Sequence, residues 1–332
     1  MPELRQDPIS RCRVIIAKNR YVRPHEYHKV ASRVESIQCP FCEGAESQTP
    51  GEILAYRDPE SSPDGRGWRV RVVPNKFPSL ESFGDMSRLG ESSGDFTPAV
   101  GVHEVIIESP RHIKSLSELS TQEVAEVFRA YRDRLCMLRN ENRLAYGLIF
   151  KNVGAAAGAS VEHAHSQLMA ISFLPATVQQ KWQAAQEFHD QNKRCVFCDL
   201  AVQEQAQRVR LVEVSRYCVA ICPYASRFPY EMCVYPRSHQ SHFESTSGQV
   251  LEDLAGLMRR LLAKLERATE GIGYNYLVHT APFDTGPVPH YHWHVEILPR
   301  LSTAGGFEWG TGCFVNTVPP EEAAERLAQL EI

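Results

Sequence analysis

The sequence predicts an α+β protein in which one architecture occurs twice. A Cys-x-x-Cys pair stands at residues 39–42 and again at 195–198, and a His-x-His pair stands at residues 163–165 and again at 292–294. Between these pairs each half carries strand-like runs and one long amphipathic helix, in the same order. A repeated motif order indicates a duplicated unit, and strands in series with a single helix favour a mostly antiparallel sheet. The length of 332 residues fits two domains, which we expect at residues 1–180 and 181–332.

The strands are indicated by short runs rich in β-branched side chains. Residues 69–73 alternate polar and apolar side chains, which is typical of a half-buried strand. Further strands are expected at residues 103–108, 148–150, 232–235 and 295–298. The run 81–98 contains three glycines and four serines and has no counterpart in the second half. We expect it to be a loop insertion.

One long helix per half is indicated by apolar residues at helical spacing. The sequence Ser120-Thr121-Gln122-Glu123 has the form of a capping box and precedes the first helix. Its buried stripe is expected to comprise Val124, Val127, Phe128, Tyr131 and Leu135. The second helix, at residues 249–267, has a matching stripe of Val250, Leu254, Leu257, Leu261 and Leu265. Residues 175–193 are polar and are expected to form a helix or connector between the halves.

The composition is that of an ordinary globular protein. Hydrophobic residues make up 43% of the chain and charged residues 23%, and the formal net charge is −4. This charge gives no electrostatic reason to expect a nucleic acid or an anionic membrane as partner. The chain opens with polar residues and has no apolar run of the ~18 residues that span a bilayer. We therefore expect a cytoplasmic location.

The two Cys-x-x-Cys pairs predict two metal sites. This spacing lets two thiolates share one tetrahedral zinc ion, and alignment of the halves supplies two equivalent histidines for each. The predicted ligand sets are Cys39, Cys42, His112 and His163, and separately Cys195, Cys198, His239 and His292. Four protein ligands leave no position open for substrate, so we expect structural Zn²⁺. His242 and His290 compete as ligands in the second set. The other six cysteines are expected to be buried thiols.

A nucleophile is predicted at His165. The run 152–160, Asn-Val-Gly-Ala-Ala-Ala-Gly-Ala-Ser, has small residues that let the backbone approach a phosphate group, and it directly precedes His163-Ala164-His165-Ser166-Gln167. By itself such a run is equally consistent with a tight turn in a packed core. Alternate residues of a strand share one face, so we expect His163, His165 and Gln167 to point the same way. A neutral imidazole is a competent nucleophile near neutral pH.

Residues 152–167 resemble the active-site segment of the galactose-1-phosphate uridylyltransferases, the transferase branch of the histidine-triad superfamily. The resemblance covers nearly the whole chain, including Arg5-x-Asp7-Pro8, Arg20-x-x-Arg23-Pro24 and residues 305–316. It implies two histidine-triad-like repeats that form an intramolecular pseudo-dimer. It also implies a ping-pong reaction in which His165 attacks the α-phosphorus of UDP-glucose, glucose 1-phosphate leaves, and galactose 1-phosphate collects the uridylyl group.

The resemblance also implies the residues that bind substrate. Arg20 and Arg23 would face the phosphates, and in the family such residues can come from the partner subunit of a homodimer. The stretches that contact the substrate correspond to Asn75, Lys76, Asn152, Gly158, Ala159, Ser160, Phe307, Gly310 and Thr311. Residues 307–313 and the second Cys-x-x-Cys pair depart from the best-known uridylyltransferases and resemble a branch that contains ADP-glucose phosphorylases.

The expected function is therefore a nucleotidyltransferase of galactose and carbohydrate metabolism that acts on a nucleotide sugar and a sugar 1-phosphate. The first alternative is an ADP-glucose:phosphate adenylyltransferase. A histidine-triad hydrolase is disfavoured because Gln167 stands where such hydrolases tend to carry a third histidine. A zinc-dependent nucleic-acid-binding module is disfavoured by the net charge and the absence of a basic stripe. His294 is the counterpart of His165, but Glu296 replaces the glutamine and no glycine-rich loop precedes it.

Overall fold

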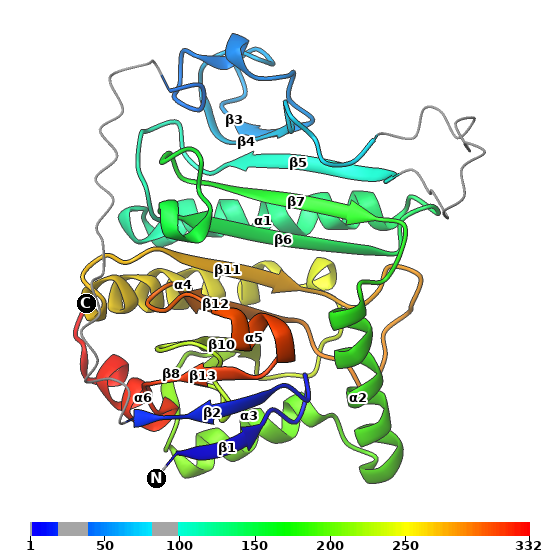
Figure 1. Ribbon diagram of the computed structural model, residues 1–332. Coiled ribbons are helices and arrows are strands. Elements are labelled where there is room, and N and C mark those ends of the chain that lie inside the picture. The colour runs from blue at the N-terminus through cyan, green and yellow to red at the C-terminus, as the bar shows by residue number, and fades with distance from the viewer. Residues whose placement is uncertain (1, 19–38, 82–98) are drawn as a thin grey trace.

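The computed structural model describes residues 2–18, 39–81 and 99–332, and its main element is one ten-stranded antiparallel sheet (Figure 1). The strand order is β3-β4-β5-β7-β6-β11-β12-β10-β9-β8. The strands of the first half are β3 (Leu54–Arg57), β4 (Trp68–Pro74), β5 (Gly101–Ile107), β6 (Tyr146–Val153) and β7 (His165–Ile171). Those of the second half are β8 (Leu211–Val214), β9 (Cys218–Ile221), β10 (Met232–Pro236), β11 (Tyr274–His279) and β12 (His294–Pro299). Each half thus contributes five neighbouring strands, and the halves meet where β6 pairs with β11.

Two long helices, α1 (Thr121–Arg139) and α4 (Gly248–Ala268), lie against each other on one face of this sheet (Figure 1). The Ser120 hydroxyl accepts from the N–H of Glu123, and the Glu123 side chain accepts from the N–H of Ser120, so α1 begins with the expected capping box. The expected stripe of α1 is fully buried, and on α4 only Val250 is partly exposed. Both helices share one hydrophobic core with the inward side chains of the strands.

The opposite face of the second half is covered by other elements. The helices α2 (Ala176–Asn192) and α3 (Val196–Gln207) supply Ala185, Phe197 and Ala201, which pack with Val219, Ile221 and Tyr235 of the sheet. A small sheet joins β1 (Glu3–Gln6) and β2 (Arg13–Ile16) to β13 (Phe314–Asn316), and β13 runs parallel to β2. The described N-terminal residues therefore pack on the second half. The short helix α5 (Gly306–Thr311) precedes β13, and α6 (Pro320–Gln329) ends the chain.

The structure confirms the α+β class and the antiparallel sheet, and it corrects two details. β7 begins at His165, so His163 lies in the bend before the strand and not on it. Cys136 is exposed on α1, and Cys12 and Cys313 are only partly buried, so the expectation of buried thiols is correct only for Cys218, Cys222 and Cys233.

The expected loop insertion falls, apart from Glu81, outside the described residues. The division at residue 180 stays a prediction. Within the described ranges, no helix has the length and apolar character that a membrane crossing requires.

Candidate active site

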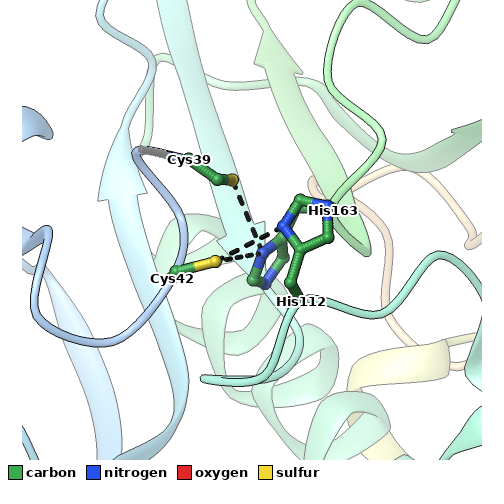
Figure 2. A group of neighbouring side chains, drawn as sticks. All are labelled: Cys39, Cys42, His112 and His163. Atoms are coloured by element: carbon green, nitrogen blue, oxygen red, sulfur yellow. Dashed lines mark hydrogen bonds between the residues drawn. The ribbon is translucent and has the colours of Figure 1, made fainter. Parts of the chain in front are cut away.

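The first predicted ligand set comes together in one place (Figure 2). The Sγ atom of Cys42 lies 3.4 Å from Nδ1 of His112 and 3.5 Å from Nδ1 of His163, and Sγ of Cys39 lies 3.6 Å from the same His163 atom. His163 Nε2 donates to the carbonyl oxygen of Ser109 at 2.8 Å, which leaves the Nδ1 lone pair for a metal. Burial lowers the pKa of His163 to about 4, so this imidazole is neutral. Two thiols and two imidazoles are a donor set that fits zinc.

The second predicted set has the same geometry on different elements. Cys195 caps the N-terminus of α3, whereas Cys39 and Cys42 lie in a turn. Sγ of Cys198 lies 3.4 Å from Nδ1 of His239 and 3.6 Å from Nδ1 of His292. Each imidazole again donates through Nε2 to a carbonyl, His239 to Val288 at 2.9 Å and His292 to Pro236 at 3.0 Å. The four potential ligand atoms of each set lie within 4.8 Å of one another.

The competing histidines lie outside this second set. The ring of His242 contacts the hydroxyls of Ser241 and Thr285 at 2.8 and 3.4 Å. The ring of His290 packs on Trp182, with centroids 4.4 Å apart. The arrangement therefore favours His239 and His292 as the ligands.

His294 belongs to a closely packed ionic cluster. Together with His279 and Glu296 it forms a buried group whose potential ligand atoms also lie within 4.8 Å. However, Lys181 and Arg227 both form ion pairs with Glu296. Burial alone would raise the pKa of Glu296, but these two cations hold it well below its usual value. The carboxylate is already neutralised by the protein, and the His294 ring is surrounded by His279, Phe197, Tyr235 and Tyr291.

His165 stands at the first position of β7 and its ring orientation is fixed. Its Nδ1 lies 2.7 Å from the carbonyl oxygen of His163. Because a carbonyl oxygen can only accept, Nδ1 carries the proton and Nε2 keeps its lone pair. Burial lowers the pKa of His165 below its ordinary value, which favours the neutral ring. Phe41, between the two cysteines of the first set, packs on this ring with centroids 5.2 Å apart.

A buried polar network lies on the helix side of β7, behind His165. Lys151 Nζ donates to the carbonyl oxygen of His165 at 3.1 Å and forms an ion pair with Glu108. The hydroxyl of Tyr131 donates to Glu108 at 2.8 Å and lies 2.7 Å from Oγ of Ser166. These contacts hold the chain directly after the His165 Cα, at its carbonyl group and at Ser166. The sequence analysis did not identify the network, although Lys151 is the only charged residue of β6 and could have indicated it.

Gln167 lies on the same face as His165, two residues farther along β7, and its side chain is held from one side. Its Oε1 accepts from Nε2 of His103 at 2.8 Å and from Nδ2 of Asn75 at 3.4 Å. The sequence analysis placed His103 at the start of an expected strand and gave it no role in the site. His103, Val105 and Ile107 stand at every second position of β5 and share one face, and this spacing was the signal that could have placed His103 on the Gln167 face.

The small-residue run forms a tight loop after β6. Gly154 and Gly158 have φ values of +80° and +85°, which glycine adopts without strain. The N–H groups of Ala157 and Ala159 donate to the carbonyl of Gly154 inside the loop. In the part of the chain that the structure describes, the Ser160 hydroxyl makes no hydrogen bond. Asn275 of the second half donates to Asn152 at 2.7 Å and to the carbonyl of Ala157 at 2.8 Å, so both halves shape this loop.

The remaining predicted residues divide into three groups. Lys76 is exposed near the site, with Nζ 3.4 Å from the carbonyl oxygen of Gln48. Phe307, Gly310 and Thr311 lie on α5, which is well separated from the start of β7 (Figure 1), so one chain does not bring them to His165. Arg20 and Arg23 lie outside the described residues.

Comparisons with known proteins agree with this geometry. A family model described as a domain of unknown function (DUF4921) matches residues 100–331. ADP-glucose phosphorylase of Arabidopsis thaliana is 32% identical over all of this chain and 93% of its own length. The crystal structure of an ADP-glucose phosphorylase from that plant, with bound ADP-glucose, superposes with a TM-score of 0.85 and covers 100% of this chain and 99% of the other.

A galactose-1-phosphate uridylyltransferase of Thermotoga maritima is 28% identical over 100% of this chain and 99% of its own length. Both relatives carry the names of nucleotidyltransferases, and both are similar to this chain over its full length. The chain therefore belongs to the family of galactose-1-phosphate uridylyltransferases and ADP-glucose phosphorylase and is a nucleotidyltransferase.

Proposed function

We propose that the protein transfers the nucleotidyl group of a nucleotide sugar to a phosphate acceptor through a covalent bond to Nε2 of His165. The observation that carries this proposal is the 2.7 Å contact between His165 Nδ1 and the His163 carbonyl. This contact fixes the tautomer in which Nδ1 carries the proton and the Nε2 lone pair is free. His165 lies on the face of β7 that also carries Gln167. A covalent intermediate divides one difficult transfer into two easier ones.

The two half-reactions follow from this geometry. The Nε2 lone pair forms a bond to the α-phosphorus, and the bond between this phosphorus and the sugar-phosphate oxygen breaks. The sugar 1-phosphate leaves with the electron pair as a stable anion and needs no acid. A phosphate oxygen of the acceptor then attacks the same phosphorus, and Nε2 recovers its lone pair. The amide N–H of Gln167 donates to a phosphoryl oxygen as charge develops on it.

The donor proposed first is UDP-glucose, with galactose 1-phosphate or a similar hexose 1-phosphate as acceptor. Full-length similarity to a uridylyltransferase that is 28% identical supports it. ADP-glucose with inorganic phosphate as acceptor is the second candidate. It is favoured by the 32% identity to ADP-glucose phosphorylase and by the TM-score of 0.85.

One experiment tests the mechanism and separates the donors. The protein is incubated with UDP-glucose or ADP-glucose alone, quenched in base, and its intact mass is measured. We expect a uridylyl or an adenylyl adduct that is absent from the His165→Ala variant and retained by His294→Ala. If neither nucleotide sugar modifies the wild-type chain, the proposed function is wrong.

We also propose that each Cys₂His₂ set holds one Zn²⁺ ion. Their donor types and the grouping of the four potential ligand atoms within 4.8 Å of one another support zinc, and each set fills all four positions with protein groups. A bound ion would cross-link the loop around residues 39–42 to β5 and β7 in the first half, and α3 to β10 and β12 in the second. The role is therefore structural.

Finally, we propose a cytoplasmic homodimer. Phe307 and Trp309 of α5 are 51% and 81% exposed, so one chain leaves most of these large aromatic surfaces uncovered. In a dimer they are available to the active site of the partner subunit. The thiols of the two Cys₂His₂ sets require a reducing compartment, which supports the location.

A further inference from the structure

The side chain of His103 has no part in the proposed mechanism, but it contacts Gln167, which does. His103 of β5 lies beside β7, half-buried, and it connects two parts of the site. On one side its Nδ1 lies 3.1 Å from the backbone nitrogen of Ser79. On the other its Nε2 lies 2.8 Å from Oε1 of Gln167.

These two contacts determine which nitrogen of His103 carries the proton. The N–H of Ser79 can only donate, so Nδ1 of His103 accepts. A neutral imidazole has one N–H group, which must then be on Nε2, and it points at Gln167 Oε1. The nearby amide nitrogen of Asn75 is 3.0 Å from this Nε2 and donates to the same Oε1. The Oδ1 of Asn75 already accepts from the N–H of Phe77 at 2.9 Å, which fixes the Asn75 amide in this orientation.

Both donors therefore face the same oxygen of Gln167. An amide side chain can rotate by half a turn and exchange its oxygen and nitrogen. Rotation here would turn the Gln167 NH₂ group towards two N–H donors and leave both without an acceptor. The contacts thus hold Oε1 towards His103 and Asn75 and leave the NH₂ group on the side away from these donors, on the face of β7 that also carries His165. An unrestrained glutamine would present its oxygen to a phosphoryl oxygen for part of the time, and two acceptors repel.

We infer that His103 is a positioning residue that orients the Gln167 amide for the phosphoryl oxygen of the transferred nucleotide. This inference rests on the proposed function, since it gives His103 a role only if Gln167 contacts that phosphoryl group. Donors that are oriented before the reaction stabilise transition-state charge without reorganisation. His103 itself does not touch the substrate.

The chain allows a matched pair of variants at this position. The Oδ1 of an asparagine overlies Nδ1 of a histidine, so His103→Asn keeps an acceptor for Ser79 but does not reach Gln167. The Nε2 of a glutamine overlies Nε2 of a histidine, so His103→Gln keeps the donor towards Gln167. His103→Asn therefore removes the contact with Gln167 and preserves the contact with Ser79. His103→Gln preserves the contact with Gln167 and removes the contact with Ser79.

The experiment measures the single-turnover rate of nucleotidyl-enzyme formation, together with steady-state kcat and KM, for wild type, His103→Asn and His103→Gln. We expect His103→Asn to lower the rate and kcat about tenfold with KM little changed, as the loss of one hydrogen bond in the transition state requires. We expect His103→Gln to recover most of this loss. Thermal unfolding of His103→Asn should match wild type.

A double-mutant cycle with Gln167→Ala completes the test. If His103 acts through Gln167, His103→Asn has no further effect once the glutamine is gone. Equal rates for wild type and His103→Asn, or an undiminished effect in the Gln167→Ala background, overturn the inference. Both outcomes differ from failure of the proposed function, in which the wild-type chain forms no nucleotidyl adduct at all.

Discussion

Lys151 and Glu108 form an ion pair that is almost completely excluded from solvent, at 1% and 2% exposure. Two charges lose their hydration at such a site, and the pair is tolerated because each partner has further hydrogen bonds. Lys151 donates to the His165 carbonyl, and Glu108 accepts from Tyr131. A buried ion pair of this kind is weak evidence for stability, but removal of one partner is costly.

Replacement of Lys151 by Met should therefore destabilise the protein by about 3–5 kcal/mol, because Glu108 is left as an unpaired buried charge. The double variant Lys151→Met with Glu108→Leu should recover much of this loss. Urea denaturation measures both. The control is Lys114→Met, which breaks the exposed ion pair with Glu162 and should change the free energy of unfolding by less than about 1 kcal/mol. Equal effects at Lys151 and Lys114 would contradict the interpretation.

At the scale of the elements, the two Cys₂His₂ sets differ in what they hold together. A zinc ion in the first set would anchor the turn that carries Phe41, and Phe41 packs on His165. A zinc ion in the second set would anchor the start of α3, in the half that has no glycine-rich loop. The same donor set would thus support the proposed catalytic centre in one half and only the fold in the other.

Metal analysis of the purified protein should give about two zinc ions per chain and none at the group of His279, His294 and Glu296, where Lys181 and Arg227 already neutralise the carboxylate. Cys42→Ala and Cys198→Ala should each remove one ion. We expect both variants to unfold at lower temperature, and Cys42→Ala to lose more nucleotidyl transfer, because Phe41 is no longer held. A greater loss of transfer in Cys198→Ala would refute this division.

Local patterns predicted much of this arrangement from the sequence. The capping box and apolar spacing located α1 and α4, and the register of the two repeats paired each Cys-x-x-Cys with the two histidines that lie beside it in the structure. The parallel contact of β13 with β2 joins residues that lie about as far apart in sequence as the chain allows, and no local pattern records it. His103 and Lys151 were missed for the same reason. Their partners are Gln167 of β7 and Glu108, directly after β5, and only the order of the strands in the sheet brings these side chains together.

At the scale of the whole molecule, the exposed aromatic side chains of α5 predict a site shared between subunits. If each active site combines His165 of one chain with α5 of the other, two inactive variants should complement each other. We expect His165→Ala mixed with Phe307→Ala to recover transfer activity after subunit exchange, whereas each variant alone stays inactive. Light scattering should give the mass of a dimer. A monomer in solution, or no recovery in a mixture shown to contain mixed dimers, would contradict the arrangement.

The junction between β6 and β11 has a consequence for symmetry. Phe150 pairs with Gln167 and Leu277 with Glu296, so Phe150 and Leu277 are equivalent, and they face each other across the junction. Two residues beyond them stand Asn152 and His279, which are equivalent positions with different side chains. Identical subunits in a two-fold dimer would carry the same residue at both places. A single polypeptide is free of this constraint. The position of Asn152 therefore carries an amide that acts with Asn275 on the glycine-rich loop, while the equivalent position carries the packed imidazole of His279.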